Sequence, residues 1–430
     1  MKICAIILSA GKSNRFNSDK PKFMHEISGQ QIINYNINAV KKIKKITKLF
    51  IITSSQNEKY LENIEPNIFI QNPLDGTGGA LKQFAKVNKN FDYYLVLLAD
   101  TPIFEYKILQ NFLNKSISQK NDVSVISQFI DNPEGYGRIV IKKNSFYQII
   151  EDKDCNAIQK KINLVNTGIF LISKKAISNI DLIKRNINKK EFYLTDLVSI
   201  SKQKNMRTFA YINKETEIRG VNTISELNEL ETLSQIHIKN KIMNAGAIIH
   251  NPETVYIEEN AKIEKGVIIE PNVVIKKNVS IKNGTTIRSF SYLEDAKIGS
   301  NCIIGPFARL RPGTILEGGN RVGNFVEIKK SKLSKGVKAN HLTYIGDTIV
   351  GKNTNIGAGT ITCNYDGKNK LSCKIGNNSF IGSNTSIVAP VEIGANSYIA
   401  AGSVITKNIP KKSFSISRAK QKIYKNRIIK

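Results

Sequence analysis

Aliphatic residues recur at every sixth position through most of the C-terminal half of the chain. They form three runs separated by slips and an insertion: Ile257, Ile263, Ile269, Ile275, Ile281, Ile287 and Leu293; Ile298, Ile304, Leu310, Leu316, Val322 and Ile328; and Ile375, Ile381, Ile387, Ile393, Ile399 and Ile405. Neither an amphipathic helix nor an alternating strand holds a period of six for this length. The period is typical of a parallel β-helix, because a short strand and its turn take six residues and three such sides close one coil. About two dozen hexads predict roughly eight coils.

The N-terminal half shows a different pattern, in which short β-branched runs alternate with helical spacing as far as about residue 220. The runs KICAIIL, KLFIIT, YLVLLA, DVSVIS and GIFLIS have the length and composition of buried strands. Their alternation with helices predicts an α/β domain with a Rossmann-like, mainly parallel sheet.

A polar amphipathic segment, TISELNELETLSQIHIKNKIMNAG, separates the two patterns. Thr223 and Glu226 have the spacing of a capping box, and Gly246 supplies a helix stop. We therefore predict an N-terminal domain over residues 1–222, a connecting helix over 223–246 and a β-helix over 247–430.

Length and charge set wider limits. The 430 residues exceed what one hydrophobic core usually organises, which agrees with two domains. The 64 Lys and Arg against 35 Asp and Glu give a net charge of +29, which favours phosphorylated ligands or nucleic acid. The basic residues are spread along the whole chain and form no block or arm, so we expect no nucleic-acid role and keep it as a third class of function.

Cysteine and histidine spacing argues against disulfides and zinc. The five cysteines, Cys4, Cys155, Cys302, Cys363 and Cys373, form neither a disulfide framework nor a C-x-x-C knuckle, which predicts reduced thiols and a cytoplasmic protein. The four histidines are widely separated, unlike zinc ligands. The apolar opening MKICAIILSAGK passes directly into a basic loop, so we interpret it as a buried strand. We expect no membrane role, because no other apolar run approaches the ~20 residues of a span.

Two features of the N-terminal half point to phosphate chemistry. The loop LSAGKSNRF follows the first strand and can turn its N–H groups toward a phosphate, with Lys12 and Arg15 adding charge. In LLADTP, Asp100 ends a buried strand, where a carboxylate is costly unless it meets a cation or donors. Taken alone, each has an ordinary explanation: a simple turn and a helix N-cap.

Polar strings interrupt the hexapeptide repeat at GPFARLRPG, GNFVEIKK, NHLTYIGD and between Thr362 and Lys374. Insertions in a solenoid stay outside the coil and commonly build its binding face. His341 lies in one of these strings, where it could be a simple surface imidazole. Around it, Arg311 and Lys329 offer cations for a phosphate, Tyr344 a donor and Glu327 a carboxylate partner for the histidine.

Motifs from both halves together identify a family. PKFMH, IQNPLDGTGGA, LLADTP, GYGRIV, IIEDKD, VNTGIF and RGVNT resemble sugar-nucleotide pyrophosphorylases. GPFARLRPG, VGNFVE, HLTYIGD and NIGAGTITCNYDG extend the resemblance, over nearly the whole chain, to bifunctional N-acetylglucosamine-1-phosphate uridyltransferases / glucosamine-1-phosphate acetyltransferases. The resemblance implies a left-handed β-helix, a homotrimer and a role in building the bacterial cell envelope.

For the N-terminal half, the resemblance implies sites for UTP, N-acetylglucosamine-1-phosphate and Mg²⁺. The implied uridylyl-site residues are Leu8, Ser9, Ala10, Gly11, Arg15, Lys22, Gln71, Gly76, Thr77 and Asn222, with Gly137, Glu151 and Asn166 at the N-acetylglucosamine moiety. Asp100 and Asn222 are the implied Mg²⁺ ligands. The chain departs from the family pattern with Ser13-Asn14 in the nucleotide loop and Arg219 before GVN, which affects the expected loop geometry and metal affinity.

For the C-terminal half, the resemblance implies acetyl transfer from acetyl-CoA to glucosamine-1-phosphate with His341 as general base. Arg311, Lys329, Tyr344, Asn355 and Lys370 are the implied sugar-phosphate ligands, and Ala358, Asn364, Tyr365, Ser383, Ala401 and Arg418 lie along acetyl-CoA. Asn340 replaces a usual Gly before the histidine, which affects the expected local turn. The basic tail after Ile409 could clamp the acidic CoA phosphates or a neighbouring subunit, and simple disorder is the alternative for such a terminal segment.

We therefore predict a bifunctional enzyme that first acetylates glucosamine-1-phosphate and then uridylylates the product to UDP-N-acetylglucosamine, releasing pyrophosphate. The alternative is a sugar-1-phosphate nucleotidyltransferase whose β-helix is only a scaffold. HLTYIGD and the CNYDG loop discriminate, because a scaffold needs neither.

Overall fold

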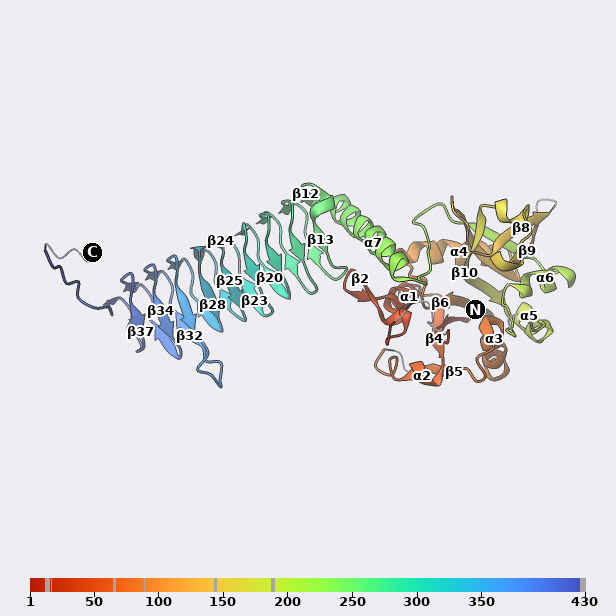
Figure 1. Ribbon diagram of the computed structural model, residues 1–430, viewed down its shortest axis with the longest axis horizontal. Coiled ribbons are helices and arrows are strands. Elements are labelled where there is room, and N and C mark those ends of the chain that lie inside the picture. Colours follow the sequence, from red (N-terminus) through yellow and green to blue (C-terminus); the bar gives the residue numbers. More distant parts are fainter. Residues whose placement is uncertain are drawn as a thin grey trace. The chain divides into compact units, whose positions relative to one another are not determined.

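The chain divides into two units, Met1–Ser234 and Gln235–Lys430, in a computed structural model (Figure 1). The structure describes residues 1–11, 16, 18–64, 67–88, 90–142, 145–186 and 190–425. The two units meet within α7 (Ile224–Asn244), inside the segment predicted as a connecting helix.

A mixed sheet forms the centre of the first unit. Its order is β11 (Thr208–Ile212), β7 (Val123–Phe129), β10 (Leu164–Ser173), β6 (Tyr93–Leu98), β1 (Ile3–Leu8), β4 (Ile46–Thr53) and β5 (Ile68–Ile70). Every neighbouring pair is parallel except β10 with β6 and with β7, so the predicted mainly parallel sheet is confirmed. Strand β10 runs against its neighbours because the chain returns to it through a hairpin, β8 (Arg138–Lys142) and β9 (Ser145–Ile150), without a helical crossover.

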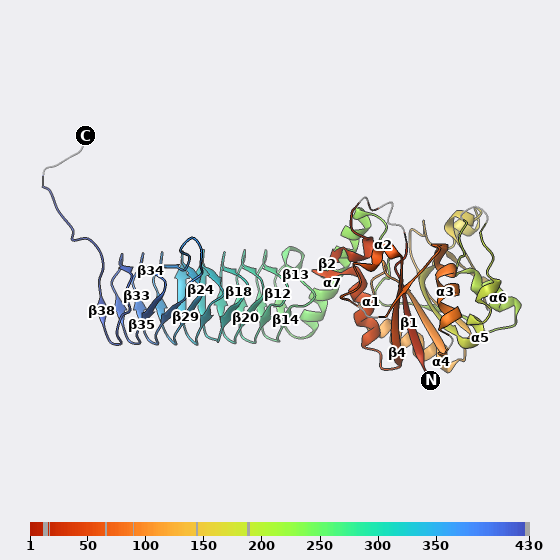
Figure 2. The same ribbon diagram turned by 90° about the horizontal axis from the view of Figure 1, so that it is seen from below.

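Helices cover both faces of this sheet (Figure 2). Ile3, Ala5 and Ile7 of β1 pack into one apolar cluster with α1 (Ile32–Lys41) and α4 (Tyr106–Ser118). The alternate residues Cys4, Ile6 and Leu8 pack into another cluster with α3 (Gly76–Val87), α5 (Lys174–Ile177) and α6 (Asp196–Gln203). A strand buried on both faces reads as a continuous apolar run, which explains KICAIIL. The shorter elements of this unit are β2 (Glu26–Ile27), β3 (Gln30–Gln31), α2 (Ser55–Glu58), and the 3₁₀ turns η1 (Lys22–Met24), η2 (Asp152–Asp154), η3 (Gln159–Lys161) and η4 (Ile180–Leu182).

The second unit is the expected left-handed parallel β-helix, with three sheets as its faces. Face 1 consists of β12 (Ile248–Ile249), β15 (Ile268–Ile269), β18 (Thr286–Ile287), β21 (Ile303–Ile304), β24 (Arg321–Asn324), β27 (Lys338–His341), β30 (Asn355–Ile356), β33 (Phe380–Ile381), β36 (Tyr398–Ile399) and β38 (Phe414–Ser415). Face 2 consists of β13 (Tyr256–Ile257), β16 (Val274–Ile275), β19 (Tyr292–Leu293), β22 (Arg309–Leu310), β25 (Glu327–Lys329), β28 (Tyr344–Gly346), β31 (Ile361–Cys363), β34 (Ser386–Val388) and β37 (Val404–Ile405). Face 3 consists of β14 (Lys262–Ile263), β17 (Ser280–Ile281), β20 (Ala296–Ile298), β23 (Thr314–Leu316), β26 (Lys332–Leu333), β29 (Thr348–Val350), β32 (Cys373–Ile375) and β35 (Val391–Ile393). A 3₁₀ turn, η5 (Pro252–Thr254), lies between β12 and β13.

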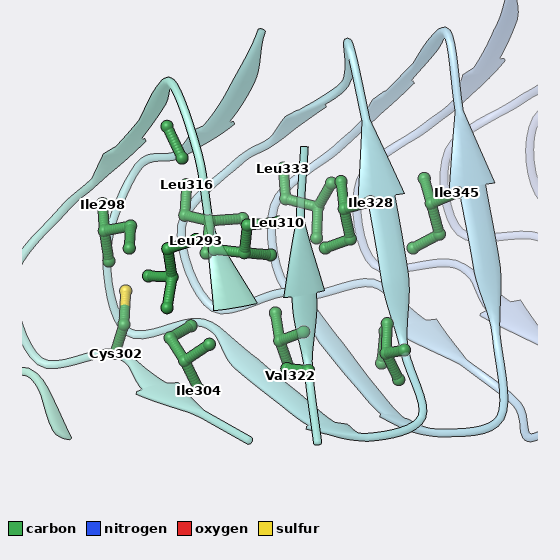
Figure 3. Close-up of a cluster of buried hydrophobic side chains, with 14 of the residues drawn as sticks. Leu293, Ile298, Cys302, Ile304, Leu310, Leu316, Val322, Ile328, Leu333 and Ile345 are labelled. Atoms are coloured by element: carbon green, nitrogen blue, oxygen red, sulfur yellow. The ribbon is translucent and has the colours of Figure 1, made fainter. Parts of the chain in front are cut away.

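The aliphatic repeat fills the interior of the coil. Every residue of the three predicted runs is buried except Ile263, which is partly buried against the same core. Figure 3 shows these side chains stacked from coil to coil. The repeat continues between Ile328 and Ile375 through Leu333, Ala339, Ile345, Val350 and Ile356, and then meets buried Thr362, whose hydroxyl accepts a hydrogen bond from the Gly346 amide at 2.7 Å. At the predicted interruption a polar residue, Thr362, therefore takes the inward position of an aliphatic one, and a loop that points away from the coil follows it.

The capping box that begins α7 is confirmed. Glu226 Oε2 accepts hydrogen bonds from the amides of Asn222 (2.5 Å) and Thr223 (3.2 Å), and Thr223 Oγ1 accepts one from the Glu226 amide (3.2 Å). Gly246 follows the helix at φ +99°, a conformation that favours glycine. None of the helices in the described ranges combines the length and the apolar character that a membrane span requires.

We expect Ile304→Ala to lower the free energy of unfolding of the β-helix by about 2–5 kcal/mol, because it leaves a cavity in a fully buried stack. Ile315→Ala makes the same change at a side chain that is 37% exposed and should cost far less. Chemical denaturation followed by circular dichroism measures both. Equal losses would contradict the assigned inward register.

Two candidate catalytic sites

Three predicted uridylyl-site residues converge at the carboxyl edge of the N-terminal sheet. Lys22 Nζ forms an ion pair with Asp100 and lies 3.4 Å from Asn222 Oδ1. Asp100 follows β6, and its carbonyl accepts a hydrogen bond from the Val221 amide at 2.9 Å, which brings the GVN segment beside it. The Asp100 carboxylate at this strand end was expected to need a cation, and Lys22 provides it from a distant part of the chain.

The loop after β1 reaches the same edge, because Leu8 of β1 is paired with Leu98 of β6. Ser9 is buried, and both its amide (2.7 Å) and its hydroxyl (3.1 Å) donate to the Ile52 carbonyl. Ala10 is half-buried and Gly11 exposed, with open space where a Cβ would lie. Lys12, Ser13, Asn14 and the predicted contact Arg15 lie outside the described residues.

Gln71, Gly76 and Thr77 adjoin this edge and have structural partners. Buried Gln71 donates from Nε2 to Asp75 Oδ1 (3.0 Å) and to the Gly76 carbonyl (3.1 Å). Gly76 has φ +92°, and a Cβ there would lie 2.8 Å from the Phe192 carbonyl oxygen. The Thr77 hydroxyl accepts a hydrogen bond from the Leu194 amide at 3.2 Å. These contacts fix the start of α3 against the 192–194 segment.

The three residues expected at the N-acetylglucosamine moiety lie together. A Cβ on Gly137 would lie 3.7 Å from both Glu151 Oε2 and Asn166 Cβ, and the Asn166 amide donates to the Gly137 carbonyl at 2.8 Å. Burial raises the pKa of the Glu151 carboxyl; a 2.8 Å hydrogen bond from Thr195 opposes this shift, and nearby aspartates add to it. The cluster combines a small backbone position with a desolvated acceptor, which suits a neutral polar ligand.

Arg219, which departs from the family pattern, has its positive charge neutralised by neighbouring acids. Its guanidinium pairs with Glu217 at 2.7 Å and Glu229 at 2.9 Å, and the hydrogen bond to Glu217 is the main cause that raises its pKa. Both carboxylates lie within its own unit. The arginine charge is therefore compensated by two acids beside the GVN segment.

Asp100 and Asn222 provide oxygen ligands of the kind that a hard divalent cation prefers. The Asp100 carboxylate and Asn222 Oδ1 lie close enough together for both to contact the Lys22 ammonium. Among the residues that the structure describes, no group of three or more His, Cys, Asp or Glu side chains could hold a metal ion. A cation at this edge would therefore take its remaining ligands from water and phosphate oxygens.

His341 and Tyr344 flank the corner between face 1 and face 2 of the β-helix. His341 ends β27 and Tyr344 begins β28, with Leu342 between them at φ +48°. Lys329 pairs in register with Gly346 of β28, and Arg311 follows β22 one coil earlier. Arg311 and Lys329 thus lie on face 2 at the opposite ends of these strands from the histidine corner.

The partner of the His341 ring is Asn324. His341 Nδ1 lies 2.9 Å from Asn324 Oδ1, on the adjacent strand of face 1. An amide oxygen only accepts, so this hydrogen bond requires Nδ1 as the donor, and in the neutral ring Nε2 is then the nitrogen with a lone pair. Within one chain Glu327, the residue expected to support the histidine, lies on face 2 and pairs with Arg311 at 2.7 Å.

The Tyr344 hydroxyl belongs to a second polar group on the same coil. A Cβ on Gly346 would collide with both the Tyr344 hydroxyl and Asn364 Nδ2, so the absent side chain leaves room for them. Asn364 donates from Nδ2 to Asp347 Oδ2 at 2.5 Å. Two residues expected in different binding regions, Tyr344 and Asn364, are therefore neighbours.

The loop between β31 and β32 projects from the coil (Figure 1) and carries Tyr365 and Lys370. These two residues pair across the loop, with Lys370 Nζ 3.9 Å from the centroid of the Tyr365 ring. Asn355 begins β30 on face 1, in register with Lys338 of the preceding coil. The loop thus holds an exposed cation and an exposed aromatic ring beside Asn364.

Four residues expected along acetyl-CoA follow one corner of successive coils. The Ala358 carbonyl accepts from the Asn384 amide (2.7 Å), the Ser383 carbonyl accepts from the Gly402 amide (2.8 Å), and the Ala401 carbonyl accepts from Arg418 Nη1 (2.7 Å). This corner continues the one at Leu342, whose carbonyl accepts from the Gly359 amide at 3.1 Å. The row leads away from His341 and ends at a guanidinium.

Three site neighbours were missed from the sequence: Thr195, Asn324 and Asp347. Asn324 had a usable signal, because it precedes His341 by 17 residues, close to one coil of three hexads. Asp347 follows directly in HLTYIGD. Thr195 had no local signal, since the contact with Glu151 joins positions 44 residues apart.

We expect Glu151→Gln to weaken N-acetylglucosamine-1-phosphate binding by about 10- to 100-fold, the cost of a hydrogen bond to a charged group. The Gln side chain can still accept from Thr195, so folding should survive. Isothermal titration of the sugar phosphate, with thermal unfolding as the control, measures this. Unchanged affinity would contradict the expected role of Glu151.

The same variant also predicts a pH effect. Since the pKa of the Glu151 carboxyl is raised in the folded chain, its contribution to stability is complete below the unfolded pKa and is lost as pH rises through the folded value. The free energy of unfolding of Glu151→Gln should therefore decline less between acidic and neutral pH than that of the unaltered chain. Parallel pH profiles from urea unfolding would contradict this.

Both units match families of known proteins. The MobA-like NTP transferase domain matches residues 5–151, the bacterial transferase hexapeptide (six repeats) matches 295–330 and 372–407, and the GMPPB C-terminal domain matches 251–307. The bifunctional protein GlmU of Thermosipho melanesiensis is 38% identical over 434 residues, covering 97% of this chain and 95% of the relative. Bifunctional protein GlmU of Bartonella bacilliformis is 40% identical over 432 residues, covering 99% and 96%. Because these alignments run through both units, the chain belongs to the family of the bifunctional protein GlmU.

Proposed function

We propose that this chain is a bifunctional transferase that acetylates glucosamine-1-phosphate in its β-helix and uridylylates the product in its N-terminal unit. The observation that carries the proposal is kinship over both units with proteins named as bifunctional. Each unit also brings expected site residues together: Lys22, Asp100 and Asn222 in one, and Tyr344 and Asn364, on the coil that carries His341, in the other.

Acetyl transfer needs a base for the amine of glucosamine-1-phosphate. With its proton on Nδ1, His341 offers the Nε2 lone pair to take a proton as the amine attacks the thioester carbonyl. The intermediate collapses by expelling the CoA thiolate, and backbone N–H groups stabilise the oxyanion. Lys329 and Arg311 are the proposed phosphate cations. Since Arg311 is paired with Glu327 in the single chain, Lys329 is the less compensated of the two.

Uridylyl transfer joins the phosphate of N-acetylglucosamine-1-phosphate to the α-phosphorus of UTP and expels pyrophosphate. The reaction depends on alignment and charge neutralisation and needs no protein nucleophile. A bound divalent cation, proposed as Mg²⁺ on Asp100 and Asn222, supplies neutralisation of phosphate charge. Lys22 adds an ammonium, and Gly137, Glu151 and Asn166 orient the sugar.

The proposed assembly is a homotrimer working in the cytoplasm on cell-envelope precursors. An exposed apolar ladder supports self-association. Phe290, Phe307 and Phe325 stack with ring centroids 4.8 and 5.2 Å apart, and each is about half exposed. The ladder follows the corner that also carries His341 and Leu342, so a second copy against it would lie beside the acetyl site.

A pair of variants tests the two activities. His341→Ala should lower acetyl transfer by about 10²- to 10⁴-fold, the usual cost of losing a general base, and spare uridylyl transfer. Asp100→Ala should do the reverse. A coupled assay with glucosamine-1-phosphate, acetyl-CoA, UTP and Mg²⁺, scored separately for CoA and pyrophosphate, measures both. Absence of CoA release from the unaltered chain would instead favour a nucleotidyltransferase with a scaffold β-helix.

Asn324→Ala tests the orientation of the histidine ring. Without the Asn324 oxygen, nothing on β24 fixes which nitrogen of the His341 ring carries the proton or how the ring is oriented. We therefore expect kcat for acetyl transfer to fall by about 10-fold or more while the KM values change little. Asn283→Ala is the matched control, because the Asn283 side chain accepts from the Ser300 hydroxyl several coils before His341. An equal fall in kcat for Asn283→Ala and Asn324→Ala would contradict the assignment.

A further inference from the structure

Lys22 contacts both residues that would ligate the divalent cation. Its ammonium pairs with the Asp100 carboxylate and lies 3.4 Å from Asn222 Oδ1. The Lys22 and Asp100 side chains are only about one-fifth exposed, at 19% and 20%. A carboxylate so shielded from water needs a compensating charge, and the lysine provides it.

Hydrogen bonds that do not involve the lysine hold the backbone that carries the two acceptors. The Val221 amide donates to the Asp100 carbonyl at 2.9 Å, and Thr101 Oγ1 donates to Asp100 Oδ1 at 3.3 Å. The Asn222 amide donates to Glu226 at the start of α7. Lys22 itself reaches them from η1, on a flexible four-carbon stem. The backbone at both acceptors is therefore fixed by contacts that do not involve Lys22, whereas the ammonium is carried on a long, flexible side chain.

A divalent cation and this ammonium cannot share the pair. Both would lie within a few ångströms of the same oxygens, where repulsion between like charges is strong in a partly desolvated site. A lysine ammonium is also a good phosphate ligand, so a triphosphate arriving at this edge offers it an alternative partner.

We propose that Lys22 occupies the divalent-cation position in the nucleotide-free enzyme, and that the UTP triphosphate opens this position by drawing the ammonium away from Asp100 and Asn222. This inference rests on the proposed uridylyl site. Metal and nucleotide binding are then coupled through one side chain, and the coupling is reciprocal because it is an equilibrium property. The free enzyme keeps its carboxylate neutralised until nucleotide and metal arrive together.

The test measures Mn²⁺ binding to the full-length, nucleotide-free protein by electron paramagnetic resonance of the free ion. Lys22→Met and Lys22→Gln should each bind Mn²⁺ at least about 10-fold more tightly than the unaltered chain, and adding Asp100→Asn to Lys22→Met should remove that gain. Lys175→Met is the charge-matched control. It lies on α5, which follows β10 at the opposite edge of the sheet, and should leave Mn²⁺ affinity unchanged.

Circular dichroism and thermal unfolding establish that each variant is folded, and the neutral but polar Lys22→Gln serves if Lys22→Met is unstable. Mn²⁺ affinity that stays at the unaltered level in the folded Lys22 variants overturns the inference. So does an equal gain in Lys175→Met, which would reflect net charge alone. Failure of the proposed function is a separate result: pyrophosphate release that persists in Asp100→Ala. Loss of release there, with unchanged Mn²⁺ affinity in the Lys22 variants, rejects only the lysine exchange.

Discussion

The inward stacking of aliphatic side chains in the β-helix is the constraint on which the C-terminal site depends. Each strand can bury its apolar residue only if the next coil places another directly above it, as Leu293, Leu310, Ile328 and Ile345 do on face 2. That register leaves the flanking residues pointing outward at a fixed spacing. Asn324 and His341 consequently meet on adjacent strands although 17 residues separate them. The geometry of this candidate site therefore follows from core packing.

Parallel strand ends play the equivalent role in the N-terminal unit. Strands β1, β6, β4 and β5 run in the same direction, so the loop at Ser9, the turn at Asp100 and Gln71 emerge at one edge. Backbone hydrogen bonds then bring in the distant GVN segment. Open α/β sheets commonly bind ligands at this edge for the same reason. Here the edge brings together Lys22 and Asp100, whose opposite charges compensate each other.

Several cations at the candidate sites are paired with nearby carboxylates, although the chain has a large excess of basic residues. Arg219 is held by two glutamates, Arg311 by Glu327, and Lys22 by Asp100. Each of these cations is paired with an acid of its own unit. Such pairs orient the cation and lower the cost of leaving it partly desolvated.

The sequence by itself determined the β-helix, the α/β unit, the capping box of α7 and the family, because periodicity and contiguous motifs are local properties of the chain. It also supplied Asp100, Asn222 and His341 as candidates, since each stands in a recognisable string. Only the tertiary structure decided the partners: Asn324 rather than Glu327 beside His341, Thr195 beside Glu151, and Lys22 upon Asp100. These contacts join residues 17, 44 and 78 positions apart, where strand register and sheet order, and not local spacing, determine which side chains meet.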